Sequence, residues 1–263
     1  MKKNEKENFI EIKITKDYTI KKSIKKINEE RINPKIWDWC YLNLKPILNE
    51  VIYFVSKLKE DNSRNVLDLG CGTKPYNKLF DFTNKYIGFD VQKNEKVDYI
   101  GVNWKLPFGD DEFDSLMSTQ VLEHTEEICE TIKEIKRVVK NNGLIFISVP
   151  FVFPEHEIPN DFFRFSRYGI QKIFRDFDIL KITPSNGYFG TIFLAINTVI
   201  HYIPGSSYFA FPIFFLNNAC SLAMDLFFKI FFKLFNSGKM RDIYEYYYLG
   251  FPANYAVLFR NKK

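Results

Sequence analysis

Cysteines are few in this 263-residue chain, and no two of them lie close together. Cys40, Cys71, Cys129 and Cys220 form no C-x-x-C pair, so neither a zinc site nor a disulfide framework is indicated. We therefore predict no metal centre and a reducing, cytoplasmic location. The N-terminus is basic but lacks the apolar core of a secretory signal, and we expect no such signal.

Excess charge is also small, because the formal net charge is only +5. Much of it comes from residues 1–31, which hold ten Lys or Arg against six Asp or Glu. We predict a basic N-terminal extension over residues 1–45, whose first part is solvated and partly ordered. A contact of this segment with acidic lipid or nucleic acid is the alternative interpretation.

Apolar runs and helical patterns alternate along the rest of the chain, from residue 46 to residue 263. Strands are predicted at 65–69, 86–90, 97–102, 113–119, 144–149, 179–183 and 255–260. Helices are predicted at 46–58, 123–140 and 166–174, and Asn141-Asn142-Gly143 should end the second of them with a left-handed cap. Strands that alternate with helices predict a single α/β domain with a parallel sheet.

The loop after the first predicted strand carries the most informative pattern, Val-Leu-Asp-Leu-Gly-Cys-Gly-Thr-Lys-Pro-Tyr at residues 66–76. Gly70 and Gly72 let the backbone turn and let a ligand approach it closely. Ligands of open α/β sheets bind at the carboxyl ends of the strands, so a cofactor should lie here. A dinucleotide fingerprint is the nearest competitor, but Pro75 occupies the position of its last glycine.

This loop resembles motif I of the class I S-adenosylmethionine-dependent methyltransferases, whose pattern is close to V-L-D-x-G-C-G-x-G. Lys74 stands where a third glycine is frequent. The order of the motifs that follow is similar to that of the ubiquinone/menaquinone-type and related small-molecule methyltransferases: Asp90, Leu106-Pro107-Phe108, Phe113-Asp114 and Val121-Leu122-Glu123-His124. The resemblance covers about residues 64–150. It implies a Rossmann-like, doubly wound, mostly parallel seven-stranded sheet and S-adenosylmethionine as the cofactor.

The resemblance also implies which residues hold that cofactor. The methionine part would be held by Asp68, Gly70, Cys71 and Gly72, and its end would be lined by Ser118 and Gln120. Asp90 would bind the ribose, and Val91 would flank the adenine. Asn103 would accept a hydrogen bond from the adenine amino group, beside the position, Val102, where the family often has an Asp. His124 either bonds to the neighbouring loop or takes part in catalysis.

The segment after the fifth predicted strand, residues 149–166, should open beside the methyl donor. It resembles the H-x-x-P-x-D-x-x-R-F/Y-S/T segment of a subset of these enzymes, which includes relatives associated with surface-glycan assembly. His156 is the best candidate for a base near neutral pH. Asp161 would orient it, and Arg164 would bind an anionic group of the acceptor. Alternatively, Asp161 and Arg164 form a pair that fixes the loop, and Ser166 caps the next helix.

Residues 186–250 form an unusual apolar insertion before the last predicted strand. No stretch in it reaches the roughly 18 uninterrupted apolar residues of a spanning helix, and Asn217-Asn218 interrupts it. From 219 to 235, a four-residue interval predicts one narrow polar stripe of Ser221, Asp225, Lys229 and Lys233. Three interpretations remain open: a helical cap over the acceptor pocket, peripheral docking on a membrane, or a dimer contact. Tyr244–Tyr248 could line a sugar site or form a core face.

These patterns together predict an S-adenosylmethionine-dependent methyltransferase. It would methylate an oxygen, or less favourably a carbon or nitrogen, of a small-molecule, glycan or lipid-linked acceptor. Its location would be cytoplasmic, with contact to the inner face of a membrane through residues 186–250. Nucleic acid is disfavoured, because the chain lacks an N/D-P-P-Y motif and a basic stripe with aromatics. The alternative is a non-catalytic member of the fold that serves as a membrane-associated assembly or binding subunit.

Overall fold

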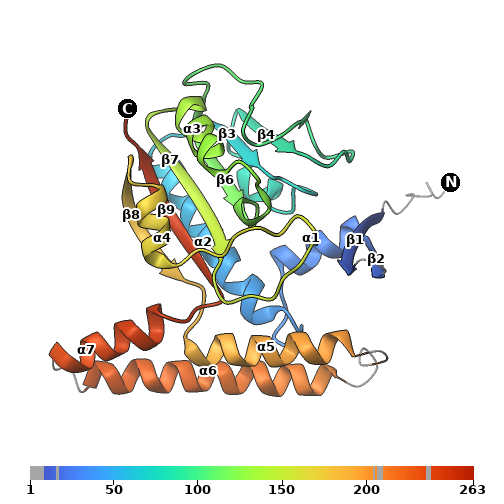
Figure 1. Cartoon of the computed structure of the whole chain (residues 1–263), viewed down its shortest axis with the longest axis vertical. Helices are drawn as coiled ribbons and strands as arrows, with labels where there is room; N and C mark the ends of the chain where they lie inside the picture. Colours follow the sequence, from blue (N-terminus) through green and yellow to red (C-terminus); the bar gives the residue numbers. More distant parts are fainter. Residues whose placement is uncertain (1–8, 16–17, 204, 206–209, 235–237) are drawn as a thin grey trace.

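The computed structural model describes residues 9–15, 18–203, 205, 210–234 and 238–263. Seven strands form one sheet in the order β5-β4-β3-β6-β7-β9-β8 (Figure 1). They are β3 (Asn65–Leu69), β4 (Lys85–Asp90), β5 (Tyr99–Ile100), β6 (Phe113–Thr119), β7 (Val139–Pro150), β8 (Phe177–Pro184) and β9 (Asn254–Asn261). Every neighbouring pair is parallel except the two pairs made by β9. The predicted seven-stranded, mostly parallel, doubly wound sheet is therefore confirmed.

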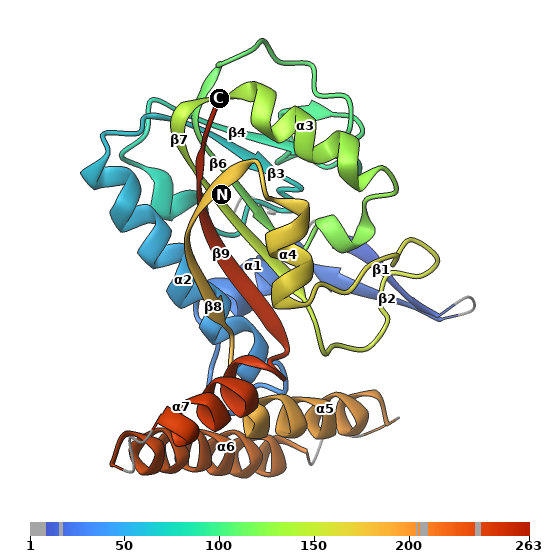
Figure 2. The ribbon, with the colours of Figure 1, turned by 60° about the vertical axis from the view of Figure 1, so that its left-hand side comes forward.

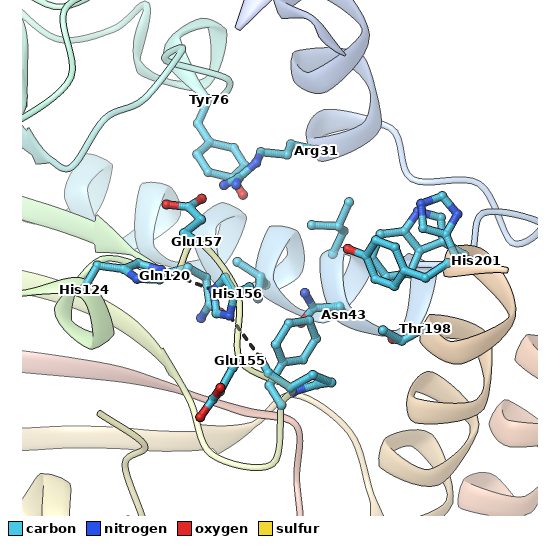
Figure 3. A pocket seen from close by; sticks show the side chains of 16 residues that line it. Arg31, Asn43, Tyr76, Gln120, His124, Glu155, His156, Glu157, Thr198 and His201 are labelled. Atoms are coloured by element: carbon cyan, nitrogen blue, oxygen red, sulfur yellow. Dashed lines mark hydrogen bonds between the residues drawn. The ribbon is translucent and has the colours of Figure 1, made fainter. Parts of the chain in front are cut away.

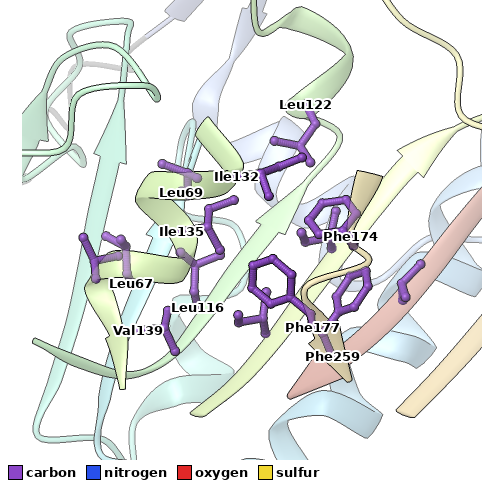
Figure 4. Close-up of a cluster of buried hydrophobic side chains, with 14 of the residues drawn as sticks. Leu67, Leu69, Leu116, Leu122, Ile132, Ile135, Val139, Phe174, Phe177 and Phe259 are labelled. Atoms are coloured by element: carbon purple, nitrogen blue, oxygen red, sulfur yellow. The ribbon is translucent and has the colours of Figure 1, made fainter. Parts of the chain in front are cut away.

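Helices cover both faces of this sheet (Figure 2). One face is covered by α2 (Tyr41–Glu60), and the other by α3 (Ile128–Val138) and α4 (Arg167–Ile173). Side chains alternate across a strand, so Leu67 and Leu69 join the core beneath α3 and α4, whereas Val66 joins the core beneath α2 (Figure 4). The carboxyl ends of β3, β4 and β6 are thereby brought to one edge.

The helix predicted at 123–140 is shorter in the structure. It begins after a 3₁₀ turn, η2 (Leu122–His124), and ends at Val138, before the predicted cap. Asn142 does adopt the left-handed conformation, with φ +65°, but inside β7. The Asn261 amide on β9 donates to the carbonyl of Lys136 at 2.9 Å and to that of Val139 at 2.7 Å. This side chain supplies the helix end with partners that the sequence pattern does not reveal.

The N-terminal segment contacts the domain. A hairpin of β1 (Phe9–Thr15) and β2 (Tyr18–Ser23) leads into α1 (Ile24–Ile32). The Asn28 amide on α1 donates to the Thr73 carbonyl at 3.1 Å, in the glycine loop after β3. Part of residues 1–31 is therefore packed against the domain, whereas the sequence predicted a solvated extension. A second 3₁₀ turn, η1 (Asn77–Phe80), follows the glycine loop.

The insertion before the last strand is helical, as predicted. It contains α5 (Tyr188–Tyr202), α6 (Phe211–Leu234), α7 (Gly238–Tyr244) and a π-helical turn, η4 (Glu245–Leu249). The run of apolar residues stops at Asn217-Asn218, yet the helix α6 continues through both residues. By length and composition, α6 is long and apolar enough to cross a membrane. In Figures 1 and 2, α5 and α6 lie side by side as a base beneath the sheet domain.

Asp114 fastens the start of β6 to the start of β3. Its carboxylate accepts hydrogen bonds from the backbone N–H groups of Arg64 at 2.9 Å and Asn65 at 2.8 Å. Asp114→Ala should lower the free energy of unfolding by about 2 kcal/mol, because both donors lose a charged partner. The control Asp178→Ala removes an exposed carboxylate on β8 and should cost much less. Urea unfolding of both variants tests this, and equal losses would contradict it.

Candidate active site

The glycine loop after β3 is pinned to the end of β4. The backbone N–H groups of Gly70 and Cys71 both donate to the Phe89 carbonyl, at 2.8 and 3.1 Å. Gly70 has φ +72°, and a Cβ there would lie 2.2 Å from the Val121 side chain. Gly72 has φ +50°, and a Cβ there would meet nothing within 4 Å among the described residues. The loop therefore presents open backbone at Gly72, where a ligand could approach it.

Asp90 lies beside this open backbone. One of its carboxylate oxygens accepts from the Gly72 N–H at 2.7 Å, and the other from the Gln92 N–H at 2.8 Å. Burial is the main cause that raises the Asp90 pKa, and these backbone bonds oppose it. Each oxygen keeps a further lone pair for a ligand hydroxyl. The next residue, Val91, is exposed, so the predicted ribose and adenine positions adjoin the glycine loop.

Lys74 explains how the chain tolerates its departure from the family pattern. It has φ +50°, in the region that favours glycine. Its side chain runs along β4 and not into the open space: the ammonium pairs with Asp98, and its Cε lies 2.1 Å from where a Cβ on Gly88 would be. Lys74 therefore leaves the approach to Gly72 clear.

Two predicted cofactor residues beneath the loop are buried. Asp68 accepts a hydrogen bond from the Tyr86 hydroxyl, and burial raises the Asp68 pKa to about 7. Burial also raises the pKa of the Cys71 thiol, so this cysteine is not a nucleophile at neutral pH. These side chains support the loop from within the fold.

Polar atoms without partners lie at the other predicted cofactor positions. The hydroxyl of Ser118 and the amide oxygen of Asn103 are buried and lack a hydrogen-bond partner among the described residues. The Asn103 amide nitrogen donates to the Thr125 hydroxyl at 3.1 Å, which leaves that oxygen available as an acceptor. Together with the open backbone at Gly72 and the carboxylate of Asp90, these atoms fit a bound nucleoside that carries a methionine.

A cavity of about 220 Å³ adjoins this region (Figure 3). Gln120, predicted to lie at the methionine end of the cofactor, contributes to its wall together with Tyr76 from the glycine loop. The other walls come from segments far apart in sequence: α1, α2, α5, and the loop after β7. The N-terminal segment and the apolar insertion thus meet the glycine loop and the predicted acceptor loop around one cavity.

His124 and His156 face each other across this cavity wall. Their Nε2 atoms are 3.2 Å apart. The Nδ1 of His124 lies 2.7 Å from the Asn160 carbonyl, and that of His156 lies 3.1 Å from the Pro154 carbonyl. Carbonyls only accept, so each Nδ1–H donates and each Nε2 presents a lone pair. Burial lowers the His156 pKa, and the neighbouring His124 lowers it further. With their Nε2 atoms facing each other, the two rings can share one proton between them.

Glu123 lies behind the two imidazoles and is fully buried. Neither of its carboxyl oxygens has a hydrogen-bond partner within the described part of the chain. Burial raises its pKa to about 8, so the group is mostly protonated at neutral pH. Its Oε1 is 3.9 Å from the Nε2 of His124 and 4.0 Å from that of His156. Ligand-type atoms of all three residues lie within 4.8 Å of one another, so the cluster suits a proton or a small cation.

Arg164 is engaged within its own loop. Its guanidinium forms a two-bonded ion pair with Asp161, each bond 2.6 Å long. Its remaining N–H groups donate to the carbonyls of Phe153, Pro154 and Phe163 at 2.8–3.0 Å. All five donors are thus occupied, and Arg164 cannot also bind an anionic acceptor as the sequence predicted.

Asp161 acts on the backbone of the same loop. It accepts from the His156 backbone N–H at 2.9 Å, while the His156 ring Nδ1 is 3.5 Å away. Ser166 caps α4 by accepting from the Gly169 N–H at 3.1 Å. The loop-fixing alternative therefore describes Asp161, Arg164 and Ser166, and Asp161 orients His156 through its backbone.

Several cavity residues could not be identified from the sequence. Arg31 comes from the N-terminal segment, and Trp39 stacks on His201 of the insertion with ring centroids 4.3 Å apart. Thr198 of α5 also lines the cavity. No motif marks any of them, because their roles depend on how distant segments pack. Tyr244, Tyr246 and Tyr248 are not among the described residues that line this cavity.

Residues 67–147 match the family model described as a methyltransferase domain. The match contains the glycine loop, Asp90 and the Val121–His124 motif, and it confirms the resemblance found in the sequence. S-adenosylmethionine is the cofactor that this family indicates.

Two uncharacterized proteins of Methanocaldococcus jannaschii are similar in sequence. One is 33% identical over 148 residues, which cover 53% of this chain and 65% of the relative. The other is 36% identical over 112 residues, which cover 38% of this chain and 53% of the relative. The chain thus spans between half and two thirds of these relatives. The solved structure of the 4+2 cyclase SpnF has a TM-score of 0.51 and 18% identity, covering 82% of this chain and 81% of that protein. It supports the fold alone.

Alanine substitutions at the two glycines of the loop should have different effects, one mainly on stability and the other mainly on cofactor binding. Gly70→Ala should destabilise the fold, because its Cβ would collide with Val121. Gly72→Ala meets open space, so it should cost little beyond the strain of its positive φ, about 1 kcal/mol. It should nevertheless weaken S-adenosylmethionine binding at least about tenfold, because the methyl occupies ligand space. Thermal melting and calorimetric titration measure the two effects, and tight binding by Gly72→Ala would contradict this assignment.

The raised pKa of Asp68 predicts that the free energy of unfolding changes with pH. This pKa is about 7 in the fold against 3.8 in the unfolded chain, so Asp68 stays protonated to a higher pH in the folded protein than in the unfolded chain. Stability should therefore fall as pH rises from 4 to 7, and level off above the folded pKa. Asp68→Asn removes this titration, so its stability relative to the native chain should rise over the same interval. Urea unfolding without cofactor at pH 5, 6, 7 and 8 measures it; a pH-independent difference would exclude a raised pKa.

Proposed function

We propose that this chain, which carries a class I S-adenosylmethionine-dependent methyltransferase domain, is an enzyme that methylates an oxygen of a small or lipid-linked acceptor. The observation that carries the proposal is the cavity that joins Gln120, beside the glycine loop, to the facing imidazoles of His124 and His156. A methyl donor held by the loop would meet a hydroxyl held in this cavity.

The cofactor would be held by the residues already described at the strand ends. Asp90 would accept hydrogen bonds from the ribose hydroxyls, and the open backbone at Gly72 would let the methionine part approach. Ser118 and Asn103 would use their unpartnered oxygens. When bound, S-adenosylmethionine supplies a methyl group that its sulfonium activates for in-line displacement. The protein then contributes mainly by positioning the acceptor oxygen in line with that methyl group.

The imidazole pair would accept the proton of the acceptor hydroxyl. As the oxygen attacks the methyl carbon, its proton would pass to one Nε2 and be shared with the other, 3.2 Å away. The carbonyls of Asn160 and Pro154 hold the rings so that the two Nε2 atoms face each other at the cavity wall. General-base catalysis of this kind contributes about 10²–10⁴-fold to rate. In this proposal His156 and His124 are catalytic, and Asp161 and Arg164 position the loop.

The histidine pair can be tested with radiolabelled S-adenosylmethionine. The labelled methyl group is followed into fractionated lipid, glycan and small-metabolite extracts, and the labelled fraction identifies the acceptor class. His156→Asn and His124→Asn should each lower transfer about 10²-fold and leave cofactor binding unchanged. EDTA should not lower transfer, because the pair carries a proton and not a metal ion.

The outcomes separate the alternatives. Near-normal transfer by both histidine variants would overturn the assignment of the base. Loss of transfer in EDTA, restored by a divalent cation, would show instead that the cluster binds a metal. Cofactor binding without transfer into any fraction would favour the non-catalytic assembly subunit, since a fold alone does not establish an activity.

A further inference from the structure

The helices α5 and α6, here called the α5–α6 hairpin, bury polar residues and expose apolar ones. Asn197, Asn218 and Ser221 are fully buried. Leu216, Leu226 and Phe227 are each about 60% exposed. Of the 26 large hydrophobic side chains that are exposed among the described residues, sixteen lie between positions 188 and 234. The hairpin thus carries most of the exposed apolar surface of a much larger chain.

Hydrogen bonds account for the two buried asparagines, whereas the Ser221 hydroxyl lacks a partner among the described residues. The Asn197 amide donates to the Asn218 side chain at 2.9 Å, and Asn217 donates to the Asn197 oxygen at 2.8 Å. The Asn218 amide also donates to the carbonyls of Ile36 and Asp38, at 2.7 and 2.9 Å. The two helices are therefore joined to each other, and to the segment before α2, by polar contacts, while many of their hydrocarbon side chains are exposed.

This distribution of polar and apolar side chains is the reverse of that expected for helices exposed to water. A helix on the surface of a soluble domain turns its apolar stripe inward and its polar face outward. Helices in lipid expose apolar side chains, because contact with the lipid hydrocarbon costs these groups nothing. Their polar side chains lie between helices, where they form hydrogen bonds. We propose that the α5–α6 hairpin docks this protein onto one leaflet of a lipid bilayer that contains anionic headgroups.

The arrangement favours docking in the membrane plane over crossing it. The polar positions of α6 continue every three or four residues from Asn218 and Ser221 through Asp225 to the exposed Lys229 and Lys233. Asp225 accepts from the Gly187 N–H at the start of α5, at 3.4 Å. The two lysines thus lie on the same side of α6 as its contacts with the domain. In Figures 1 and 2 the hairpin lies flat beneath that domain. The lysines would meet anionic headgroups while the opposite side enters the acyl region.

The acceptor cavity shares a helix with this surface. Thr198 and His201 of α5 line the cavity, whereas the neighbouring Val199 is exposed. A docked hairpin would place the cavity at the level of the headgroups. Resting on the proposed function, this geometry selects the lipid-linked acceptor: its hydroxylated head would enter the cavity while its chains stay in the leaflet.

Vesicle flotation tests the docking without any need for activity. The full-length protein, purified in mild detergent and diluted, is mixed with vesicles of phosphatidylcholine alone or with 30% phosphatidylglycerol. It should float with both, and more completely with the anionic vesicles. Leu216→Glu/Phe227→Glu should lower the bound fraction at least about fivefold, because both exposed side chains lie on the side of α6 opposite the lysines and two charges would enter the acyl region. The control Ile52→Glu/Tyr168→Glu adds the same charge at exposed apolar positions outside the hairpin and should float normally.

Calorimetric titration with S-adenosylmethionine shows whether each variant is folded and separates this inference from the proposed enzyme function. Lys229→Glu/Lys233→Glu should bind the cofactor normally and lose the preference for anionic vesicles. The inference is overturned if the native protein stays out of both vesicle types at low salt, or if the hairpin variant floats as well as the native chain. A lipid-free dimer that the hairpin substitutions dissociate would also overturn it, in favour of a second copy as the occupant.

Discussion

The rest of the site depends on the attachment of the glycine loop to the neighbouring strand. The Phe89 carbonyl takes the N–H groups of Gly70 and Cys71, and the Asp90 carboxylate takes that of Gly72. These bonds turn the chain sharply away from β3, hold the backbone open to a ligand and fix an acid beside it. Parallel pairing of β3 with β4 and β6 then brings the other cofactor positions to the same edge.

The cavity beside this edge is lined largely by segments outside the matched domain. Arg31 from α1 and His201 from α5 reach the same space as His156 from the loop after β7. The segments that lie outside the matched domain thus supply much of the wall of this cavity. The exposed apolar surface of α5 and α6 adjoins this cavity, because α5 contributes residues both to the cavity wall and to the surface of the hairpin.

Local patterns were sufficient for much of the sheet and for the placement of Asp90 beside the glycine loop. The strands Asn65–Leu69 and Phe113–Thr119 have their predicted bounds, because runs of buried residues mark them, and Asp90 joins the glycine loop as its spacing indicated. The rest depends on packing between distant segments. His124 meets His156 across 32 residues, and five hydrogen bonds to four residues already occupy Arg164. Asn217-Asn218 reads as a break in the sequence but stays helical, because both side chains bond to other segments.

The most direct test of the account is a crystal structure of the protein with S-adenosylhomocysteine, the demethylated cofactor. Both ribose hydroxyls should donate to the Asp90 carboxylate, the methionine part should pass over Gly72, and the sulfur should face the cavity that holds His124 and His156. A nucleoside bound elsewhere, or side chains filling the space above Gly72 in the presence of saturating ligand, would contradict the account.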